Sequence, residues 1–308
     1  MPELPEVETV RAGLQPALTG AVVEAIEIFD QRSLRRHLGG PAEFVASLTG
    51  RTIEAVVRRG KFLWMPLAPI GGDNGTPLAL VGHLGMSGQM LIREPAWEPD
   101  KLTRVVIRVI GTDGKPLEFR FVDQRLFGGL HLDVLIPTTD GAPGGFGNAP
   151  EGWWTNLIPQ VASHIARDPL DANFDLSRTI AKLRTKRSGI KRVLLDQNLI
   201  SGIGNIYADE SLWRAKLHYD TSADSLSKSK ATELLGHVDD ILRAAVEVGG
   251  TSFDEQYKNV NGQSGYFEIS LNAYGRTGTP CARCGTPIKR EDWANRGSHF
   301  CPRCQRKR

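Results

Sequence analysis

The four cysteines of this 308-residue chain all lie within its last 28 residues, and no other feature constrains the fold as strongly. They form two Cys-x-x-Cys pairs, Cys281 with Cys284 and Cys301 with Cys304, separated by sixteen residues. Pairs spaced in this way bring four thiolates to one tetrahedral Zn²⁺. Two disulfides are the alternative, and a cytoplasmic compartment disfavours them. The spacing therefore predicts a zinc finger whose intervening residues form a β-hairpin, with Arg296 near its tip.

The predicted zinc is structural. A segment this short buries little apolar surface, so the metal supplies most of its folding free energy. No histidine or carboxylate pattern around the cysteines indicates an open coordination position of the kind a catalytic zinc needs. We therefore expect one structural Zn²⁺ per chain and no organic cofactor.

Basic residues gather in two segments, although the net charge of the chain is only +3. Residues 178–192 carry seven Lys/Arg and no acid, and residues 276–308 carry nine Lys/Arg against two acids. Such segments are typical of a polyanion site, although solvated faces or a solubilising tail would look the same. The chain has no apolar run of membrane-spanning length and no secretory signal, which predicts a cytoplasmic protein.

The first half of the chain contains short runs in which apolar and polar residues alternate. A period near two predicts β-strands, here over residues 21–29, 52–67, 78–92, 104–110 and 117–123. Together with one early helix over residues 7–19, these runs predict an antiparallel β-sandwich. The Gly-, Pro- and Ala-rich residues 138–152 indicate a linker or a surface insertion between the two halves.

The second half changes to a helical period, with helices predicted over residues 153–166, 176–186, 190–196, 205–216 and 227–248. A glycine-bearing turn, ISGIGN, precedes the fourth of them and makes Asn205 the expected N-cap. Backbone N–H groups at that helix start, together with Lys186 and Lys191, favour an anion site. An ordinary capped helical hairpin is the alternative, but the neighbouring basic segments favour nucleic acid.

The N-terminus offers a nucleophile if Met1 is removed. Pro2 would then carry a secondary α-amine, and such amines have a pKa of about 7.7–8, so part of the population is neutral. A neutral amine can attack a sugar C1′ to form a Schiff base, and Glu3 can protonate the sugar as the base leaves. Glu6, one helical turn on, can support Glu3 or position water. The alternative is a proline-stiffened helix start whose acids interact with the helix dipole.

Seven blocks spread from residue 1 to residue 304 resemble the formamidopyrimidine-DNA glycosylase family, in order: MPELPEVETV, RRGKFL, HLGMSG, DQRLFG, LLDQN…GIGNIYADE, NAYGRTGTPC and NRGSHFCPRC. The resemblance implies a bifunctional repair enzyme that excises oxidised purines from duplex DNA and then cleaves the strand by β,δ-elimination. It implies an α+β chain with a catalytic β-sandwich (1–150), a helix–two-turn–helix domain (151–271) and the zinc finger (272–308). Monomeric action is the expected state.

The resemblance also assigns roles residue by residue. Pro2 is implied to be the Schiff-base nucleophile and Glu3 the proton donor. Lys61, in RRGKFL, matches a lysine that contacts the lesion's phosphate and assists elimination; an ordinary exposed lysine at a strand end is the alternative. Arg296 matches the finger arginine that grips phosphates and serves δ-elimination. The remaining matches are DNA-contacting positions: Lys186, Lys191 and Asn205.

Three further residues match the side chains that refill the DNA stack after base flipping, namely Met86, Arg125 and Phe127. Extruding a nucleotide costs a few kcal/mol of unstacking, and apolar or planar wedges offset it. Arg125 would hydrogen-bond the orphaned cytosine. Core packing is the alternative for Met86 and Phe127. Residues 257–267 resemble the family's loop that closes over the flipped base, and His83 is expected to be structural.

The chain departs from the family pattern at Leu102, where many members have a histidine that contacts DNA, and Arg104 is the candidate replacement. Residues 66–77 and 138–152 enlarge two loops. Two other functions stay open. The sister branch that removes oxidised pyrimidines shares the Pro2–Glu3 start and the finger, but PELPEVET and the three stack-filling residues favour the purine enzyme. A non-catalytic zinc-finger DNA-binding protein would not need Pro2, Glu3 and Lys61.

Overall fold

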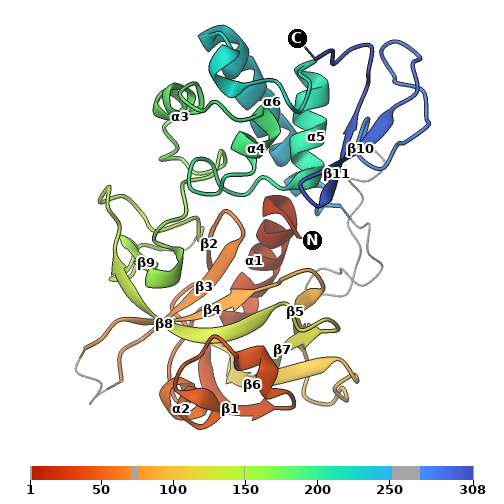
Figure 1. Cartoon of the computed structure of the whole chain (residues 1–308). Coiled ribbons are helices and arrows are strands. Elements are labelled where there is room, and N and C mark those ends of the chain that lie inside the picture. Colours follow the sequence, from red (N-terminus) through yellow and green to blue (C-terminus); the bar gives the residue numbers. More distant parts are fainter. Residues whose placement is uncertain (1, 71–74, 149, 252–270, 308) are drawn as a thin grey trace. The chain divides into compact units, whose positions relative to one another are not determined.

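The computed structural model describes residues 2–70, 75–148, 150–251 and 271–307 (Figure 1). Contacts within the chain divide it into two compact units. Unit 1 comprises Met1–His164 and Thr251–Gly265, and unit 2 comprises Ile165–Gly250 and Tyr266–Arg308. No helix in the described part of the chain is both long and apolar enough to cross a membrane.

Unit 1 contains two antiparallel sheets, which confirms the predicted sandwich class. The four-stranded sheet has the order β1 (Val22–Ile28), β6 (Thr103–Ile110), β7 (Pro116–Asp123), β5 (Gly88–Arg93). The five-stranded sheet has the order β2 (Val57–Arg59), β3 (Phe62–Leu67), β4 (Leu78–His83), β8 (Gly129–Pro137), β9 (Leu157–Pro159). Both sheets contribute side chains to one apolar core, for example Met65 from β3 and Phe121 from β7.

Two helices supply the rest of that core. Helix α1 (Leu4–Leu18) buries Val7, Val10 and Leu14, and their three- and four-residue spacing forms a single apolar stripe. It begins three residues earlier than predicted because Pro5 lies in its first turn, a position where proline is preorganised for helix. Helix α2 (Gly40–Leu48) was not predicted. The chain between them carries a short 3-10 helix, η1 (Gln31–Leu34).

The predicted helix over residues 153–166 is wrong. These residues form a turn, strand β9 and the 3-10 helix η2 (Gln160–Ala162). Ile158 pairs with Ile136 of β8, and Pro159 can neither donate an intrahelical hydrogen bond nor allow a helical residue before it. Pairing with a distant strand therefore overrides the local helical pattern.

Residues 138–152 pack onto unit 1. Phe146 pairs with Arg58 through reciprocal backbone hydrogen bonds, and the Gly144 amide donates to the Thr155 carbonyl at 2.7 Å. A Cβ atom on Gly144 would lie 1.8 Å from the Leu157 carbonyl oxygen, so the close approach of these backbones requires glycine. The segment is thus a folded surface insertion and not a free linker. Of the other insertion, residues 71–74 lie outside the described residues.

Unit 2 contains four helices and a hairpin in its described part. Four predicted helices are confirmed with shorter ends, as α3 (Leu176–Leu183), α4 (Ile190–Leu194), α5 (Asn205–Arg214) and α6 (Lys228–Glu247). A 3-10 turn, η3 (Ala223–Ser225), precedes α6. The hairpin is formed by β10 (Lys289–Trp293) and β11 (Arg296–Phe300), and β11 packs beside α5 (Figure 1).

Candidate active site and nucleic-acid interface

Pro2 and Glu3 are buried immediately before α1. Glu3 is the N-cap of this helix and forms a reciprocal capping box with Glu6. In it, the Glu6 Oε2 atom accepts a hydrogen bond from the Glu3 amide at 2.9 Å. Chain ends usually fray, and this box holds the residue next to Pro2 in a fixed position. Pro2 and Glu3 can therefore both start helix α1 and keep the predicted nucleophile, Pro2, in an ordered position.

The second oxygen of Glu6 reaches a distant segment. Its Oε1 atom accepts hydrogen bonds from the Thr251 amide at 2.7 Å and from the Thr251 hydroxyl at 2.9 Å. Glu6 is buried, so these bonds form away from water. The Glu6 carboxylate thus joins the start of α1 to Thr251, the residue at which the described range 150–251 ends. This geometry supports a positioning role for Glu6. The predicted base-covering loop, residues 257–267, lies outside the described residues.

Lys61 lies in the two-residue turn between β2 and β3, where Arg59 pairs with Phe62. Gly60 occupies the first central position with φ of +56°, as a tight type II′ hairpin requires. The lysine is half-buried, and it lies near His83 at the end of β4. Burial lowers the pKa of His83 to about 4, with smaller contributions from Arg36, Lys61 and other neighbouring cations. Lys61 therefore belongs to a cationic region of unit 1.

Two of the predicted stack-filling side chains project from unit 1. Met86 lies between β4 and β5 with 41 % of its surface exposed, and Phe127 lies between β7 and β8 with 52 % exposed. Exposure of this size in large apolar side chains contradicts core packing, which was the alternative for both residues. Arg125 lies in the same β7–β8 segment as Phe127 and is also exposed.

A buried carboxylate, Asp123, ties these two loops together. Its Oδ1 atom accepts hydrogen bonds from the Ser87 hydroxyl at 2.6 Å and from the Arg125 amide at 3.1 Å. Its Oδ2 atom accepts from the Gly128 amide at 2.8 Å. Asp123 has no exposed surface. Sequence reasoning missed this residue, although it begins the DQRLFG block and Ser87 directly follows Met86.

The backbone beside Phe127 is strained. Leu126 has φ of +57°, a conformation that costs a non-glycine residue roughly 1–2 kcal/mol. The Arg35 guanidinium donates hydrogen bonds to the carbonyls of Leu126 and Phe127, the latter at 2.9 Å. Arg35 and Asp123 therefore hold opposite sides of the segment that presents Phe127.

Arg104, the candidate replacement for the contact absent at Leu102, is half-buried and bonded within unit 1. Its Nε atom donates to the Asp123 carbonyl at 2.8 Å, and its guanidinium lies 3.7 Å from the Asp30 carboxylate. Leu102 keeps about a third of its surface exposed, and its carbonyl accepts from the Asp123 amide at 3.1 Å. The guanidinium of Arg104 thus binds the last residue of β7.

In unit 2, the prediction that Lys191 contacts a phosphate requires correction, because its side chain has no exposed surface. Its ammonium forms an ion pair with Asp209 at 2.6 Å and donates to the Ser298 hydroxyl at 2.7 Å and to the Gly297 carbonyl at 3.2 Å. A buried ammonium requires such partners. Lys191 therefore fastens the finger hairpin to the helices.

Asn205 is the first residue of α5, and the N-cap is Gly204, so the capping prediction was wrong by one position. The Asn205 Nδ2 atom donates to the Gly297 carbonyl at 3.0 Å, which joins the start of α5 to the start of β11. Its Oδ1 atom is buried without a hydrogen-bond partner among the described residues. Lys186 is exposed, and its ammonium lies 3.9 Å from the nearest carboxylate oxygen, that of Asp196.

The finger hairpin turns at Ala294 and Asn295, whose φ angles of +46° and +61° fit a type I′ turn. Trp293 pairs with Arg296 across this turn, and the Arg296 side chain is exposed. The predicted hairpin, and the position of Arg296 beside its tip, are confirmed.

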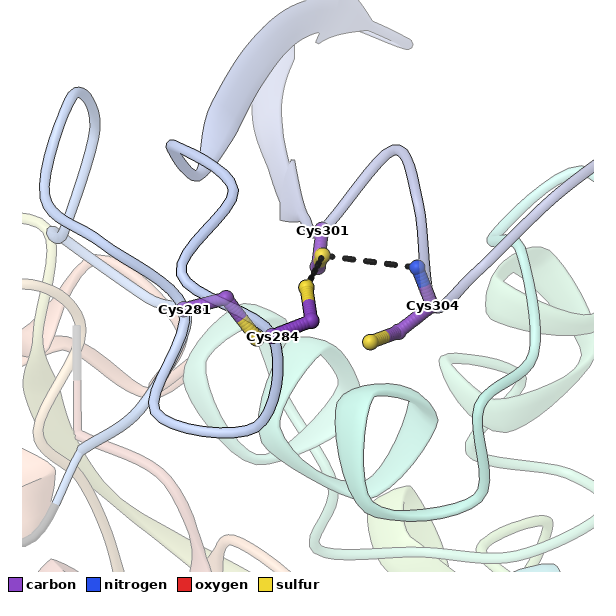
Figure 2. A group of neighbouring side chains, drawn as sticks. All are labelled: Cys281, Cys284, Cys301 and Cys304. Atoms are coloured by element: carbon purple, nitrogen blue, oxygen red, sulfur yellow. Dashed lines mark hydrogen bonds between the residues drawn. The ribbon is translucent and has the colours of Figure 1, made fainter.

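The four cysteines converge on one point, as Figure 2 shows. All four sulfur atoms lie within 4.8 Å of one another, and the Cys284 and Cys301 sulfurs are 3.5 Å apart. Tetrahedral zinc with Zn–S bonds of about 2.3 Å sets sulfur–sulfur distances near 3.8 Å. The arrangement and the thiolate donor set therefore fit one structural Zn²⁺. The Cys304 amide also donates to the Cys301 sulfur, which orients that ligand.

The finger rests on α5 through a very small apolar cluster. Trp213 from α5 lies at its centre, and the Arg283 guanidinium stacks 3.9 Å from the Trp213 ring centroid. The buried members of the cluster are Trp213, Ala273, Cys281, Ile288 and Cys301. Because two of the five are zinc ligands, the metal is part of this core.

Three family models match the chain. They are the formamidopyrimidine-DNA glycosylase N-terminal domain at residues 1–130, the formamidopyrimidine-DNA glycosylase H2TH domain at residues 165–256, and a zinc finger found in FPG and IleRS at residues 278–306. The matches follow the order of the sandwich, the helices and the finger.

Similar proteins extend over the whole chain. The formamidopyrimidine-DNA glycosylase of Leifsonia xyli is 55 % identical, covering 99 % of this chain and 100 % of the relative, and that of Streptomyces coelicolor is 49 % identical, covering 99 % and 98 %. Among solved structures, Lactococcus lactis Fpg bound to abasic-site DNA aligns with a TM-score of 0.78 at 32 % identity, covering 99 % of this chain and 100 % of the other. MutM bound to carbocyclic 8-oxo-G DNA aligns with a TM-score of 0.79 at 32 % identity, with the same coverage. The chain therefore belongs to the formamidopyrimidine-DNA glycosylase family.

Proposed function

We propose that this chain is a bifunctional DNA glycosylase and abasic-site lyase that excises oxidised purines, 8-oxoguanine and formamidopyrimidines, from duplex DNA. The observation that carries the proposal is the N-terminus, where Pro2 directly precedes Glu3, the buried N-cap of α1. Family membership supports the same activity, and solved relatives were bound to abasic-site and carbocyclic 8-oxo-G DNA.

Catalysis starts when Met1 has been removed and the Pro2 amine is neutral. The amine nitrogen attacks C1′ of the flipped nucleotide and the bond from C1′ to the base breaks, so the base leaves with its electron pair and takes up the proton that the Pro2 nitrogen releases. Glu3 then protonates O4′ as the C1′–O4′ bond breaks, and the nitrogen lone pair forms the iminium. The resulting iminium withdraws electrons from the sugar. Loss of a C2′ proton then breaks the 3′ C–O bond, and a second elimination breaks the 5′ C–O bond. Glu6 holds the Glu3 backbone in place through the capping box.

The remaining site residues handle the DNA itself. Met86, Arg125 and Phe127 fill the space that the flipped nucleotide leaves, with Arg125 facing the unpaired cytosine. Lys61 binds the lesion's phosphate, and Arg296 binds neighbouring phosphates from the exposed hairpin tip. Lys186 and Asn205 add backbone contacts, which set affinity and not sequence preference. Lys191 contributes indirectly, by holding the Gly297–Ser298 segment next to Arg296.

The zinc ion would be held by Cys281, Cys284, Cys301 and Cys304, and it supplies folding free energy and no chemistry. We also propose the domain boundaries 1–150, 151–271 and 272–308, and monomeric action. The cytoplasm is the proposed compartment, because chromosomal DNA is the substrate.

The test is borohydride trapping, which reduces the Schiff base to a stable covalent complex. Protein confirmed by mass spectrometry to lack Met1 is expected to be trapped on duplex DNA carrying 8-oxoguanine opposite cytosine. Pro2→Gly is expected to abolish trapping. Pro5→Ala, which removes the next proline but leaves the amine unchanged, is the matched control and is expected to retain it.

Each other outcome identifies a different function. No trapping on any damaged duplex, with duplex binding retained, would identify a non-catalytic DNA-binding protein. Trapping on oxidised-pyrimidine DNA alone would identify the sister activity.

A further inference from the structure

Unit 2 contains a cationic cavity that the proposed reaction does not use. The cavity, here called the knuckle cavity, has a volume of about 890 Å³ and lies between the segment after α5, the start of α6 and the second cysteine pair. Its charged or titratable lining residues are Lys216, His218, Lys230, Arg303, Arg306 and the zinc-site residue Cys304. Among the described residues, no aspartate or glutamate lines it.

Most of these cations have no partner among the residues that the structure describes. The side chains of Lys216, Arg303 and Arg306 form no hydrogen bond or ion pair with any described residue, and Lys230 alone has a carboxylate partner, Glu233 at 2.7 Å. Lys307, a cation of the same region that does not line the cavity, is paired with Asp220 at 2.6 Å. Gathering like charges without counter-charges raises the local positive potential, and an incoming anion would relieve it.

The backbone at Lys216 is a second, independent observation. Lys216 follows the C-cap of α5 with φ of +54°, and the Leu217 amide donates to the Leu212 carbonyl at 3.0 Å, which completes a Schellman motif. Glycine is the usual residue at this position, because a side chain there costs roughly 1–2 kcal/mol. A cation near a helix C-terminus recovers part of that cost. The chain nevertheless places a lysine where it lines the cavity.

The knuckle cavity is remote from two proposed phosphate contacts of unit 2, Asn205 and Arg296, whereas the carbonyl of Lys186 accepts from the Asp224 amide at 3.0 Å, next to the lining residue Ser225. Asn205 begins α5 and Arg296 begins β11, and the hydrogen bond from Asn205 to Gly297 joins these two ends. Lys216 and Arg303 follow the opposite ends of the same two elements. Each element is about 15 Å long, which exceeds the screening length of about 8 Å in physiological salt. The cavity is therefore electrostatically separate from Asn205 and Arg296.

We infer that the knuckle cavity binds an acidic, extended peptide segment of a partner protein. The volume is that of a pocket that encloses a few side chains, and a DNA duplex, about 20 Å wide, cannot enter it. Leu217 and Leu226 also line the cavity, and they can pack an apolar side chain lying between two carboxylates. A phosphate backbone offers no apolar group for them. This inference does not depend on the proposed catalytic function.

The test uses a fluorescein-labelled probe peptide of alternating aspartate and leucine, titrated with full-length, zinc-loaded protein and followed by fluorescence anisotropy. Saturable binding is expected, weakening as salt is raised. The double variant Arg303→Glu/Arg306→Glu is expected to lose about tenfold in affinity or more. The matched control, Lys289→Glu/Arg290→Glu, makes the same change of charge on β10 outside the cavity and is expected to bind within about twofold of wild type.

A competition experiment distinguishes a peptide partner from a nucleic acid. Saturating 8-oxoguanine duplex is expected to leave the peptide bound, because Asn205 and Arg296 lie at the ends of α5 and β11 opposite the cavity. Absence of peptide binding, an equal loss in the control variant, or displacement by the duplex would each overturn the inference. Tighter binding of a single-stranded oligonucleotide of the same length would also overturn it. Zinc content and circular dichroism of each variant exclude loss of fold as the cause.

Discussion

At the scale of single residues, burial has changed the acid–base behaviour of two histidines in unit 1. His131 in β8 lies opposite Val81 of β4, and burial lowers its pKa to about 4. His83, at the end of β4, has its pKa lowered to about 4 by burial and then by nearby cations, and its Nδ1 atom accepts from the Gly85 amide at 3.0 Å. Both rings are therefore neutral at pH 7, and His83 has the structural role predicted for it.

The lowered pKa of His131 predicts a dependence of stability on pH. An unfolded histidine titrates near 6.5 and this one near 4, so the unfolded chain binds more protons between these values. The contribution is fully present above pH 6.5 and is lost as the pH falls towards 4. Between pH 7 and pH 5 it amounts to about 2 kcal/mol.

Urea unfolding of wild type and His131→Leu at pH 7 and pH 5, read from the transition of unit 1, tests this expectation. The difference in unfolding free energy between pH 7 and pH 5 should be about 2 kcal/mol smaller in the variant than in wild type. His237→Leu on α6, which removes a more exposed histidine, is the control and should keep the wild-type difference. An unchanged pH dependence in His131→Leu would show that this histidine does not cause it.

At the scale of elements, the β4–β5 and β7–β8 loops depend on Asp123. Asp123→Asn replaces one accepting oxygen with a donor, so the Ser87 hydroxyl, the Arg125 amide and the Gly128 amide can no longer all be satisfied. A loss of about 1–3 kcal/mol in unfolding free energy is expected. Excision of 8-oxoguanine should slow as well, with kcat falling more than KM rises, because the loops that carry Met86 and Phe127 are no longer held for their proposed insertion.

A milder variant and a control variant test this prediction further. Ser87→Ala removes one of the three hydrogen bonds and should cost less, about 1 kcal/mol. Asp113→Asn makes the same chemical change in the exposed β6–β7 turn, where its carboxylate accepts from the Lys115 amide. It should stay within about 0.5 kcal/mol of wild type with normal excision. Equal effects at Asp113 and Asp123 would contradict a special role for the buried carboxylate.

The same elements show what sequence can and cannot predict. The zinc site was fully predictable, because all four ligands lie in two local pairs and their chemistry needs no knowledge of the fold. Helix α6 was predictable from its apolar period. In contrast, β9 depends on pairing with Ile136, and the burial of Lys191 depends on Gly297, which lies 106 residues further along the chain. Asp123 likewise acts on Ser87 across 36 residues. Local sequence patterns do not identify partners that lie so far apart in the chain.

At the scale of the whole molecule, the two units are stabilised by different means. Unit 1 has an extensive apolar core that both sheets and α1 share. Among the described residues, the finger of unit 2 has the small cluster around Trp213, which includes two cysteines of the zinc site, and the contact of the Phe300 ring with His218 and Tyr219. Structural zinc contributes about 10–16 kcal/mol in small fingers, far more than so small a cluster can supply. A single unfolding transition is therefore not expected for the chain.

Removal of zinc should consequently unfold the finger and leave unit 1 folded. After chelation, or in Cys301→Ser, hydrogen exchange measured by mass spectrometry should lose protection over residues 281–304 and keep it in β3 and β4. Duplex affinity should fall because Arg296 loses its place at the hairpin tip, and added Zn²⁺ should restore the chelated wild type but not the variant. Simultaneous loss of protection in β3 and β4 would mean that the metal stabilises both units together, which their separate cores argue against.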